Sequence, residues 1–215
     1  GDFLTVKKVV EGKLLGKLVE FEAHYDRFRN YIEPNTWKET PGRGTGIVYN
    51  LGSHMFDQVV TLFGLPTAVD ARVGIQRPEG RVDDFYDVRL RYEGLNVIVK
   101  SSYLVREPGP RYILHGTIGS FIKFGIDPQE QALKDGITPG GLNWGREDRS
   151  TWGKINTTVD GLHVEGSIET LPGNYLAFYQ NVYEAVREGK ELMVKPEQAR
   201  DVIALIEQVE KQKDK

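Results

Sequence analysis

Several chemistries are excluded by what this 215-residue sequence lacks. It contains no cysteine, so it forms no disulfide and offers no thiolate ligand to a metal. Its apolar runs are all far shorter than the roughly 20 residues that span a bilayer. Basic and acidic residues nearly balance, 28 against 31, and no Lys/Arg block supplies the positive face that nucleic acid requires. We therefore expect a cytoplasmic domain that binds neither membrane nor nucleic acid.

A dinucleotide-binding loop is also missing. No Gly-x-Gly-x-x-Gly motif follows a predicted strand, although that arrangement is needed to place a pyrophosphate at a helix N-terminus. The glycine cluster at residues 42–46 has a different spacing and follows a polar segment, residues 34–40. The sequence starts at Gly1, inside a predicted helix, rather than at a methionine. We interpret residues 1–215 as one domain of a longer protein.

Hydrophobic periodicity predicts an α+β fold. Alternating apolar and polar residues predict strands at residues 18–27, 69–75, 86–92, 95–105, 112–115, 121–124, 154–159 and 162–168. Helical spacing predicts helices at residues 1–11, 51–62, 175–186 and 196–209, with a short one beginning near residue 127 and the last two facing the core. Residues 135–148 have no clear period. Short turns between successive strands imply antiparallel pairing, so we expect one predominantly antiparallel open sheet with helices on one face.

Asn50 and His54 are the strongest candidates for chemistry. Residues 46–58 are typical of a helix start, which places these two side chains four positions apart on one helical face. Histidine is the side chain that most readily exchanges a proton near neutral pH. The glycine-rich loop before the helix allows a ligand to approach closely. The alternative interpretation is that His54 caps a packed helix and hydrogen-bonds a neighbour.

Other polar residues give weaker signals. Asp83 and Asp84 suggest the paired carboxylates of a glycosidase, but adjacent strand residues point to opposite faces and cannot easily flank one bond. His24 and Asp26 share a strand face, yet two ligands without a third are too few for a metal site. We therefore predict no metal. Structural roles are expected for two histidines in later strands, His115 and His163.

The sequence resembles the C-terminal, substrate-binding domain of the Gfo/Idh/MocA family of NAD(P)-dependent oxidoreductases. The similarity follows the family's motifs in order through nearly the whole chain, at residues 1–9, 21–29, 46–58, 82–85, 105–111, 115–121 and 125–130. It is greatest toward the bacterial branch that includes scyllo-inositol dehydrogenases. The resemblance implies the family's C-terminal, dihydrodipicolinate-reductase-like α+β fold. It also implies a Rossmann domain upstream of residue 1 that binds NAD or NADP and carries the family's catalytic lysine.

The resemblance further implies hydride transfer between the nicotinamide and a hydroxyl-bearing carbon of a sugar or cyclitol. His54 occupies the position of the family's histidine and would be the general acid/base. Asn50 stands where the family usually has an aspartate. An amide can orient the ring or hold a substrate hydroxyl, but it carries no charge to stabilise an imidazolium.

Four residues are further candidates for binding substrate: Trp37, Lys38, Tyr103 and Arg106. Trp37 either stacks on a sugar face or anchors its loop in the core. Lys38 is either a substrate ligand or a solvated charge. Tyr103 and Arg106 face either the substrate cleft or an oligomer interface. Arg111 has the chemistry of a polyol or carboxylate ligand, but we favour an ion pair with Glu107.

Three functional hypotheses follow. The first is the substrate-binding half of an oxidoreductase, inactive by itself because the cofactor site and the catalytic lysine lie elsewhere. The second is an assembly module that forms a homo-oligomer through the polar face of its sheet, which carries Arg72, Gln76, Asp87, Arg89 and Arg91. The third is a ligand-binding pseudoenzyme, suggested by the asparagine at position 50.

Overall fold

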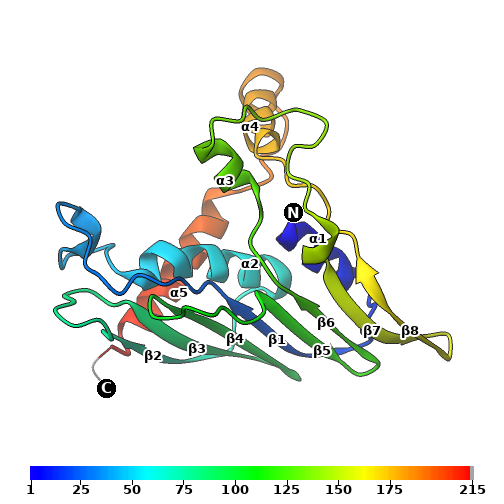
Figure 1. The fold of residues 1–215 in the computed structure, drawn as a ribbon, viewed down its shortest axis with the longest axis horizontal. Helices are drawn as coiled ribbons and strands as arrows, with labels where there is room; N and C mark the ends of the chain where they lie inside the picture. The colour runs from blue at the N-terminus through cyan, green and yellow to red at the C-terminus, as the bar shows by residue number, and fades with distance from the viewer. Residues whose placement is uncertain (214–215) are drawn as a thin grey trace.

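The computed structural model describes residues 1–213, which build one eight-stranded sheet with helices on one of its faces (Figure 1). The strands are β1 (Leu18–His24), β2 (Ala68–Gly74), β3 (Phe85–Tyr92), β4 (Leu95–Ser102), β5 (Tyr112–Gly116), β6 (Gly119–Lys123), β7 (Gly153–Val159) and β8 (Leu162–Ile168). The helices are α1 (Asp2–Glu11), α2 (Ser53–Phe63), α3 (Gln129–Lys134), α4 (Leu176–Glu188) and α5 (Pro196–Glu210). Short 3-10 turns lie at Trp37–Glu39 and Arg149–Thr151, and a π-helical turn at Val48–Gly52.

The sheet has the strand order β2-β3-β4-β1-β5-β6-β7-β8. Strand β1 lies between β4 and β5 and pairs in parallel with β4, while every other pair is antiparallel. The predicted, predominantly antiparallel α+β fold is therefore confirmed. Strands β1 and β4 end three residues earlier than predicted, at His24 and Ser102. Beyond these ends the two segments stay joined by an isolated bridge between Phe28 and Leu104 and by backbone hydrogen bonds such as that from the Val105 N–H to the Arg27 carbonyl.

The core lies between the helix side of the sheet and helices α1, α2 and α5 (Figure 1). Alternate residues of β1, Phe21 and Ala23, point into it and are fully buried. The helices contribute fully buried apolar residues at helical spacing, among them Met55, Val59, Leu205 and Val209. Each such side chain stabilises the fold by about 1.5–3 kcal/mol relative to its exposed state. Within residues 1–213, no helix covers the other face of the sheet (Figure 1).

Helix α4 corrects the sequence analysis, which placed its apolar stripe against the core. None of its residues is buried, and Tyr179 and Val186 are 68% and 77% exposed. The helix extends away from the sheet beyond α3 (Figure 1). Only the stripe of α5 faces the core as predicted. No helix within residues 1–213 has the length and apolar content to cross a membrane.

The start of the helix that carries Asn50 and His54 is fixed by a carboxylate from another part of the chain. The backbone N–H of Val48 donates to Asp83 Oδ2 at 3.0 Å, and that of Ile47 donates to the Asp83 carbonyl at 2.9 Å. The sequence analysis expected a regular helical start, but the turn is π-helical and becomes α-helical at Ser53. Gly46 precedes it with φ +91°, and a Cβ at this position would collide with the Asp83 carboxylate.

Gly46→Ala should therefore destabilise the fold more than Gly44→Ala. Both glycines have positive φ, +91° and +82°, so each substitution carries left-handed strain of about 1–3 kcal/mol. Only position 46 adds a collision, since no atom lies within 4 Å of a Cβ at position 44. Urea denaturation of both variants measures the difference. Equal losses in the free energy of unfolding would contradict the proposed anchoring by Asp83.

Candidate functional site

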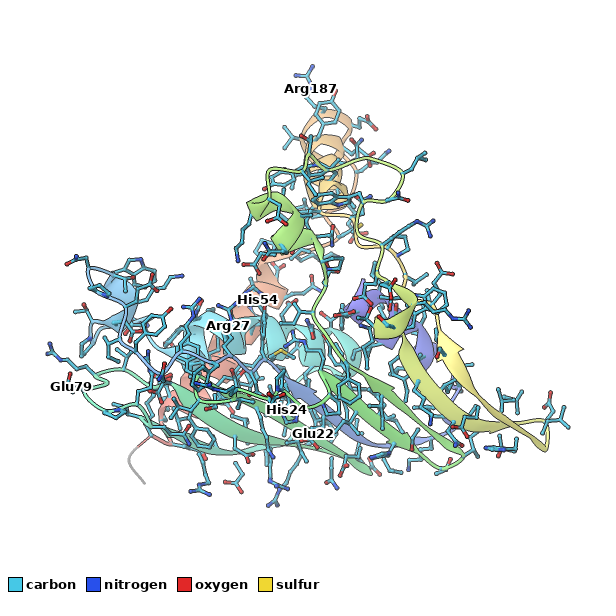
Figure 2. The ribbon with its side chains drawn as sticks, in the orientation of Figure 1. Glu22, His24, Arg27, His54, Glu79 and Arg187 are labelled. Atoms are coloured by element: carbon cyan, nitrogen blue, oxygen red, sulfur yellow. The ribbon has the colours of Figure 1, made fainter. Side chains whose placement is uncertain are left out.

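A cavity of about 710 Å³ lies on the helix side of the sheet, where the first turns of α2 face the ends of strands. Its polar lining comes from several separate segments of the chain. The helix contributes Asn50, His54 and Gln58, and the segment after β1 contributes Tyr25 and Arg27. Further lining residues include Arg111, Tyr112, Glu130, Lys134 and Tyr175. Figure 2 shows Arg27 and His54 on this side of the sheet and Glu22 and His24 lower down, at the sheet.

His54 is exposed toward the cavity, with its ring edge-on to Tyr25 at a centroid distance of 6.2 Å. The pKa of His54 is lowered from 6.5, chiefly by desolvation and then by the positive charge of Arg111, with a smaller contribution from Arg27. Asp57 opposes this shift. The imidazole is therefore mainly neutral at pH 7, which is the form that accepts a proton.

Asn50 lines the same cavity as His54 but bonds a different residue. Its Nδ2 donates to the hydroxyl oxygen of Tyr103 at 3.1 Å. Within residues 1–213 no hydrogen bond joins Asn50 to His54. Asn50 and Tyr103 also border a smaller adjoining cavity of about 270 Å³. The amide is thus held in place by a tyrosine rather than by the histidine.

The other residues predicted to bind substrate differ in whether they border the two cavities. Trp37 is 65% exposed and borders the smaller cavity, so the alternative that it anchors its loop in the core is wrong. Lys38 borders both cavities. Arg106 borders neither, and its guanidinium lies 4.1 Å from the centroid of the Phe28 ring. Contact of these residues with a substrate stays a prediction.

Arg111 corrects a second expectation, because within residues 1–213 it forms no ion pair with Glu107. Its guanidinium lies 3.9 Å from the centroid of the Tyr25 ring and donates to the His24 carbonyl. Sequence analysis also missed Tyr25 and Arg27 as members of the site. The signal was available, because the alternation that buries Phe21 and Ala23 places positions 25 and 27 on the same side.

Asp83 and Asp84 hold different elements, in agreement with their predicted opposite orientations. Asp83 bonds the helix start, whereas Asp84 Oδ2 accepts from Arg77 Nε at 2.8 Å. Arg77 is buried and also pairs with Glu39 at 2.8 Å. This chain of contacts fixes the 3-10 turn Trp37–Glu39 at the edge of the smaller cavity. Neither aspartate supports a glycosidase function.

The remaining histidines lie in the sheet or its edges. His24 contacts Glu22 at 2.6 Å and Asp26 at 3.3 Å. Burial lowers its pKa, but the hydrogen bonds to Asp26 and Glu22 outweigh this effect and raise it overall. No group of three metal-ligating side chains occurs among the described residues. His115 bonds Ser120 at 2.8 Å and His163 bonds Asn156 at 3.1 Å, consistent with structural roles.

An open, predominantly antiparallel sheet with a histidine-bearing polar cavity on its helix side defines an α+β domain with a candidate ligand site. The chain belongs to the Gfo/Idh/MocA oxidoreductase family, as its C-terminal alpha/beta domain, because the model of that domain matches residues 7–214. It is 39% identical to the scyllo-inositol 2-dehydrogenase (NADP(+)) IolW of Bacillus subtilis and 38% identical to the uncharacterised oxidoreductase YdgJ of Escherichia coli. The solved structure of the oxidoreductase yvaA from Bacillus subtilis superposes with a TM-score of 0.93 at 37% identity.

These matches cover nearly all of this chain but only part of each relative. The alignments include 96% of the chain, against 57% of IolW and 59% of YdgJ. The structural match to yvaA includes 98% of this chain and 60% of the other. The family therefore accounts for the fold and for the oxidoreductase class. Activity and substrate depend on the whole protein.

Replacing Arg111 by methionine should raise the pKa of His54, because a nearby positive charge that disfavours the imidazolium is removed. In the parent protein, the folded chain binds a proton on His54 less tightly than the unfolded chain does. Protonation of His54 therefore lowers the free energy of unfolding as the pH falls below 6.5. NMR titration of the four histidines measures the shift directly. Arg187→Met, on exposed α4, is the control and should leave His54 unchanged (Figure 2). An unchanged pKa in Arg111→Met would remove this residue from the electrostatics of the site.

Proposed function

We propose that this chain is the substrate-binding half of an NAD(P)-linked oxidoreductase that interconverts a hydroxyl and a carbonyl on a sugar or cyclitol. The observation that carries the proposal is His54, mainly neutral and facing a polar cavity of about 710 Å³. That volume is in the range of small-molecule sites. The relative IolW, a scyllo-inositol 2-dehydrogenase (NADP(+)), supports the same chemistry.

Oxidation of an alcohol removes a hydride from carbon and a proton from oxygen as the C=O bond forms. A bound nicotinamide supplies the hydride acceptor. His54 accepts the hydroxyl proton, and its lowered pKa keeps it in the accepting form at neutral pH. Asn50, positioned by Tyr103, holds a substrate hydroxyl or orients the imidazole. Because the cofactor is held outside residues 1–215 in this proposal, the chain by itself does not turn over substrate.

In the full-length protein, His54→Gln should lower kcat/KM for the best alcohol of a sugar and cyclitol panel by about 10²- to 10⁴-fold, the usual contribution of a general base. NADP⁺ or NAD⁺ reduction, followed by absorbance, is the measurement. His163→Gln, on exposed β8, is the matched control and should retain full activity.

The asparagine at position 50 favours the alternative that the protein is a pseudoenzyme. The variant Asn50→Asp distinguishes this alternative from the enzyme hypothesis. A full-length protein that gains turnover only with the aspartate, and whose His54→Gln variant behaves like the parent, would be a ligand-binding pseudoenzyme. A loss of turnover in Asn50→Asp shows that asparagine is the working residue. Turnover by the 215-residue chain alone would contradict the proposed division of labour between domains.

We further propose that the helix-free sheet face joins copies of the protein. The pairing of β2, β3 and β4 places on this face the charged residues Arg72, Asp87, Arg89, Arg91 and Lys100. Ile98 lies among them and is only 8% exposed. Charges of both signs around an apolar centre suit a self-complementary, two-fold interface. Gln76 lies beyond the end of β2 and bonds Ser102 at 2.9 Å.

Arg89→Glu should therefore shift the full-length protein toward monomer in sedimentation velocity. The introduced carboxylate lies opposite Asp70 and reverses the charge at this position of the face. Arg187→Glu changes the same charge on α4 and should leave the assembly intact. A parent protein that stays monomeric at high concentration would exclude assembly through this face.

A further inference from the structure

The charges around the large cavity do not balance. Five cationic side chains line it, Arg27, Arg29, Lys38, Arg111 and Lys134, against three carboxylates, Asp2, Asp127 and Glu130. The carboxylates are all engaged: Asp2 pairs with Lys123 at 3.1 Å, Glu130 pairs with Lys134 at 2.7 Å, and Asp127 accepts from the Gln129 N–H at 3.0 Å. Within residues 1–213, Arg27, Lys38 and Arg111 form no ion pair. The surplus of positive charge therefore faces the space where a ligand would bind.

Arg111 is the most firmly placed of these cations. It is 9% exposed, lies 3.9 Å from the centroid of the Tyr25 ring and 5.4 Å from that of Tyr112, and donates to the His24 carbonyl. This hydrogen bond uses one of the five N–H groups of the guanidinium. A charge taken this far out of water costs several kcal/mol unless an opposite charge accompanies it. The side chain is held in position without such a partner.

Arg27 approaches the same aromatic ring, with its guanidinium carbon 5.3 Å from the Tyr25 centroid. It lies in the segment after β1, which ends at His24, and projects on the helix side of the sheet, near His54 (Figure 2). Both guanidinium groups thus lie close to one ring, and within residues 1–213 neither forms an ion pair. Both also act on His54, since each lowers the pKa of its imidazole. A single anion bound by both guanidinium groups would supply the missing counter-charge and offset the desolvation of Arg111.

We propose that the substrate of this site is an acidic sugar or polyol, whose carboxylate or phosphate is bound by Arg27 and Arg111 while one of its hydroxyls reaches His54. Both ends of the site lie close to the Tyr25 ring. The Arg111 guanidinium carbon is 3.9 Å from the centroid of this ring, and the centroid of the His54 ring is 6.2 Å from it. A molecule with a six-carbon skeleton can span both. A neutral cyclitol would leave both arginines without an anion. This inference rests on the proposed function and narrows its substrate class.

Binding to the full-length protein saturated with NADP⁺ or NAD⁺ tests the proposal without requiring turnover. The probes are D-glucose, D-glucuronate and D-glucose 6-phosphate, titrated by calorimetry. At least one of the two anionic sugars should bind about tenfold or more tightly than D-glucose, the gain typical of a charge-assisted bidentate contact. Which one binds shows whether the anion is a carboxylate or a phosphate.

Arg111→Met and Arg27→Met should each remove this preference while the affinity for D-glucose changes little. Arg111→Lys keeps the charge and should retain part of the preference, so it covers the case in which the methionine variant fails to fold. Arg187→Met on α4 is the matched control and should bind like the parent.

Equal affinity for D-glucose and for both anionic sugars would overturn the proposal. So would arginine variants that weaken NADP⁺ or NAD⁺ binding instead, because the anion would then belong to the cofactor. Neither result tests the general-base role of His54, because that role is tested separately by the kcat/KM of the His54→Gln variant. The failure of the substrate class is thus distinguishable from the failure of the proposed function.

Discussion

Two adjacent carboxylates are the constraint on which the site depends. Asp83 bonds the first turn of the helix that carries Asn50 and His54, and Asp84 bonds buried Arg77, which in turn holds Glu39. Because consecutive residues of an extended chain point in opposite directions, one dipeptide positions two walls of the two cavities. Removing one partner of a buried ion pair typically costs about 3–5 kcal/mol, so these contacts leave the walls little freedom to move.

Two histidines of the domain, His24 and His54, have opposite electrostatic surroundings. His24 lies among carboxylates and its pKa is raised, whereas His54 lies near Arg111 and Arg27 and its pKa is lowered. The same side chain is thereby favoured as a cation in one place and as a neutral imidazole in the other. His54 thus lies in the cavity in surroundings that favour its neutral form, whereas His24 lies between the carboxylates of Glu22 and Asp26.

Much of this fold could be predicted from local pattern, and the exceptions have physical causes. The alternation in β1 and the helical stripe of α2 are set by burial against the sheet, so the sequence records them directly. Helix α4 has an equally apolar stripe that is exposed, because periodicity shows which side is apolar but not what covers it. The π-helical turn and the Arg111–Tyr25 contact arise from residues distant in sequence, which no local pattern reveals. His54 was singled out by helical spacing and by resemblance, whereas the position of Arg27 and Arg111 beside it came from the structure.

The central claim is that His54 meets the reacting hydroxyl in the cavity of about 710 Å³. A crystal structure of the full-length protein with NADP⁺ or NAD⁺ and the tightest-binding sugar of the panel tests it most directly. The account predicts a substrate hydroxyl within hydrogen-bond distance of an imidazole nitrogen of His54, on the carbon that faces the nicotinamide. A substrate bound elsewhere, or one oriented with no hydroxyl near His54, would contradict it.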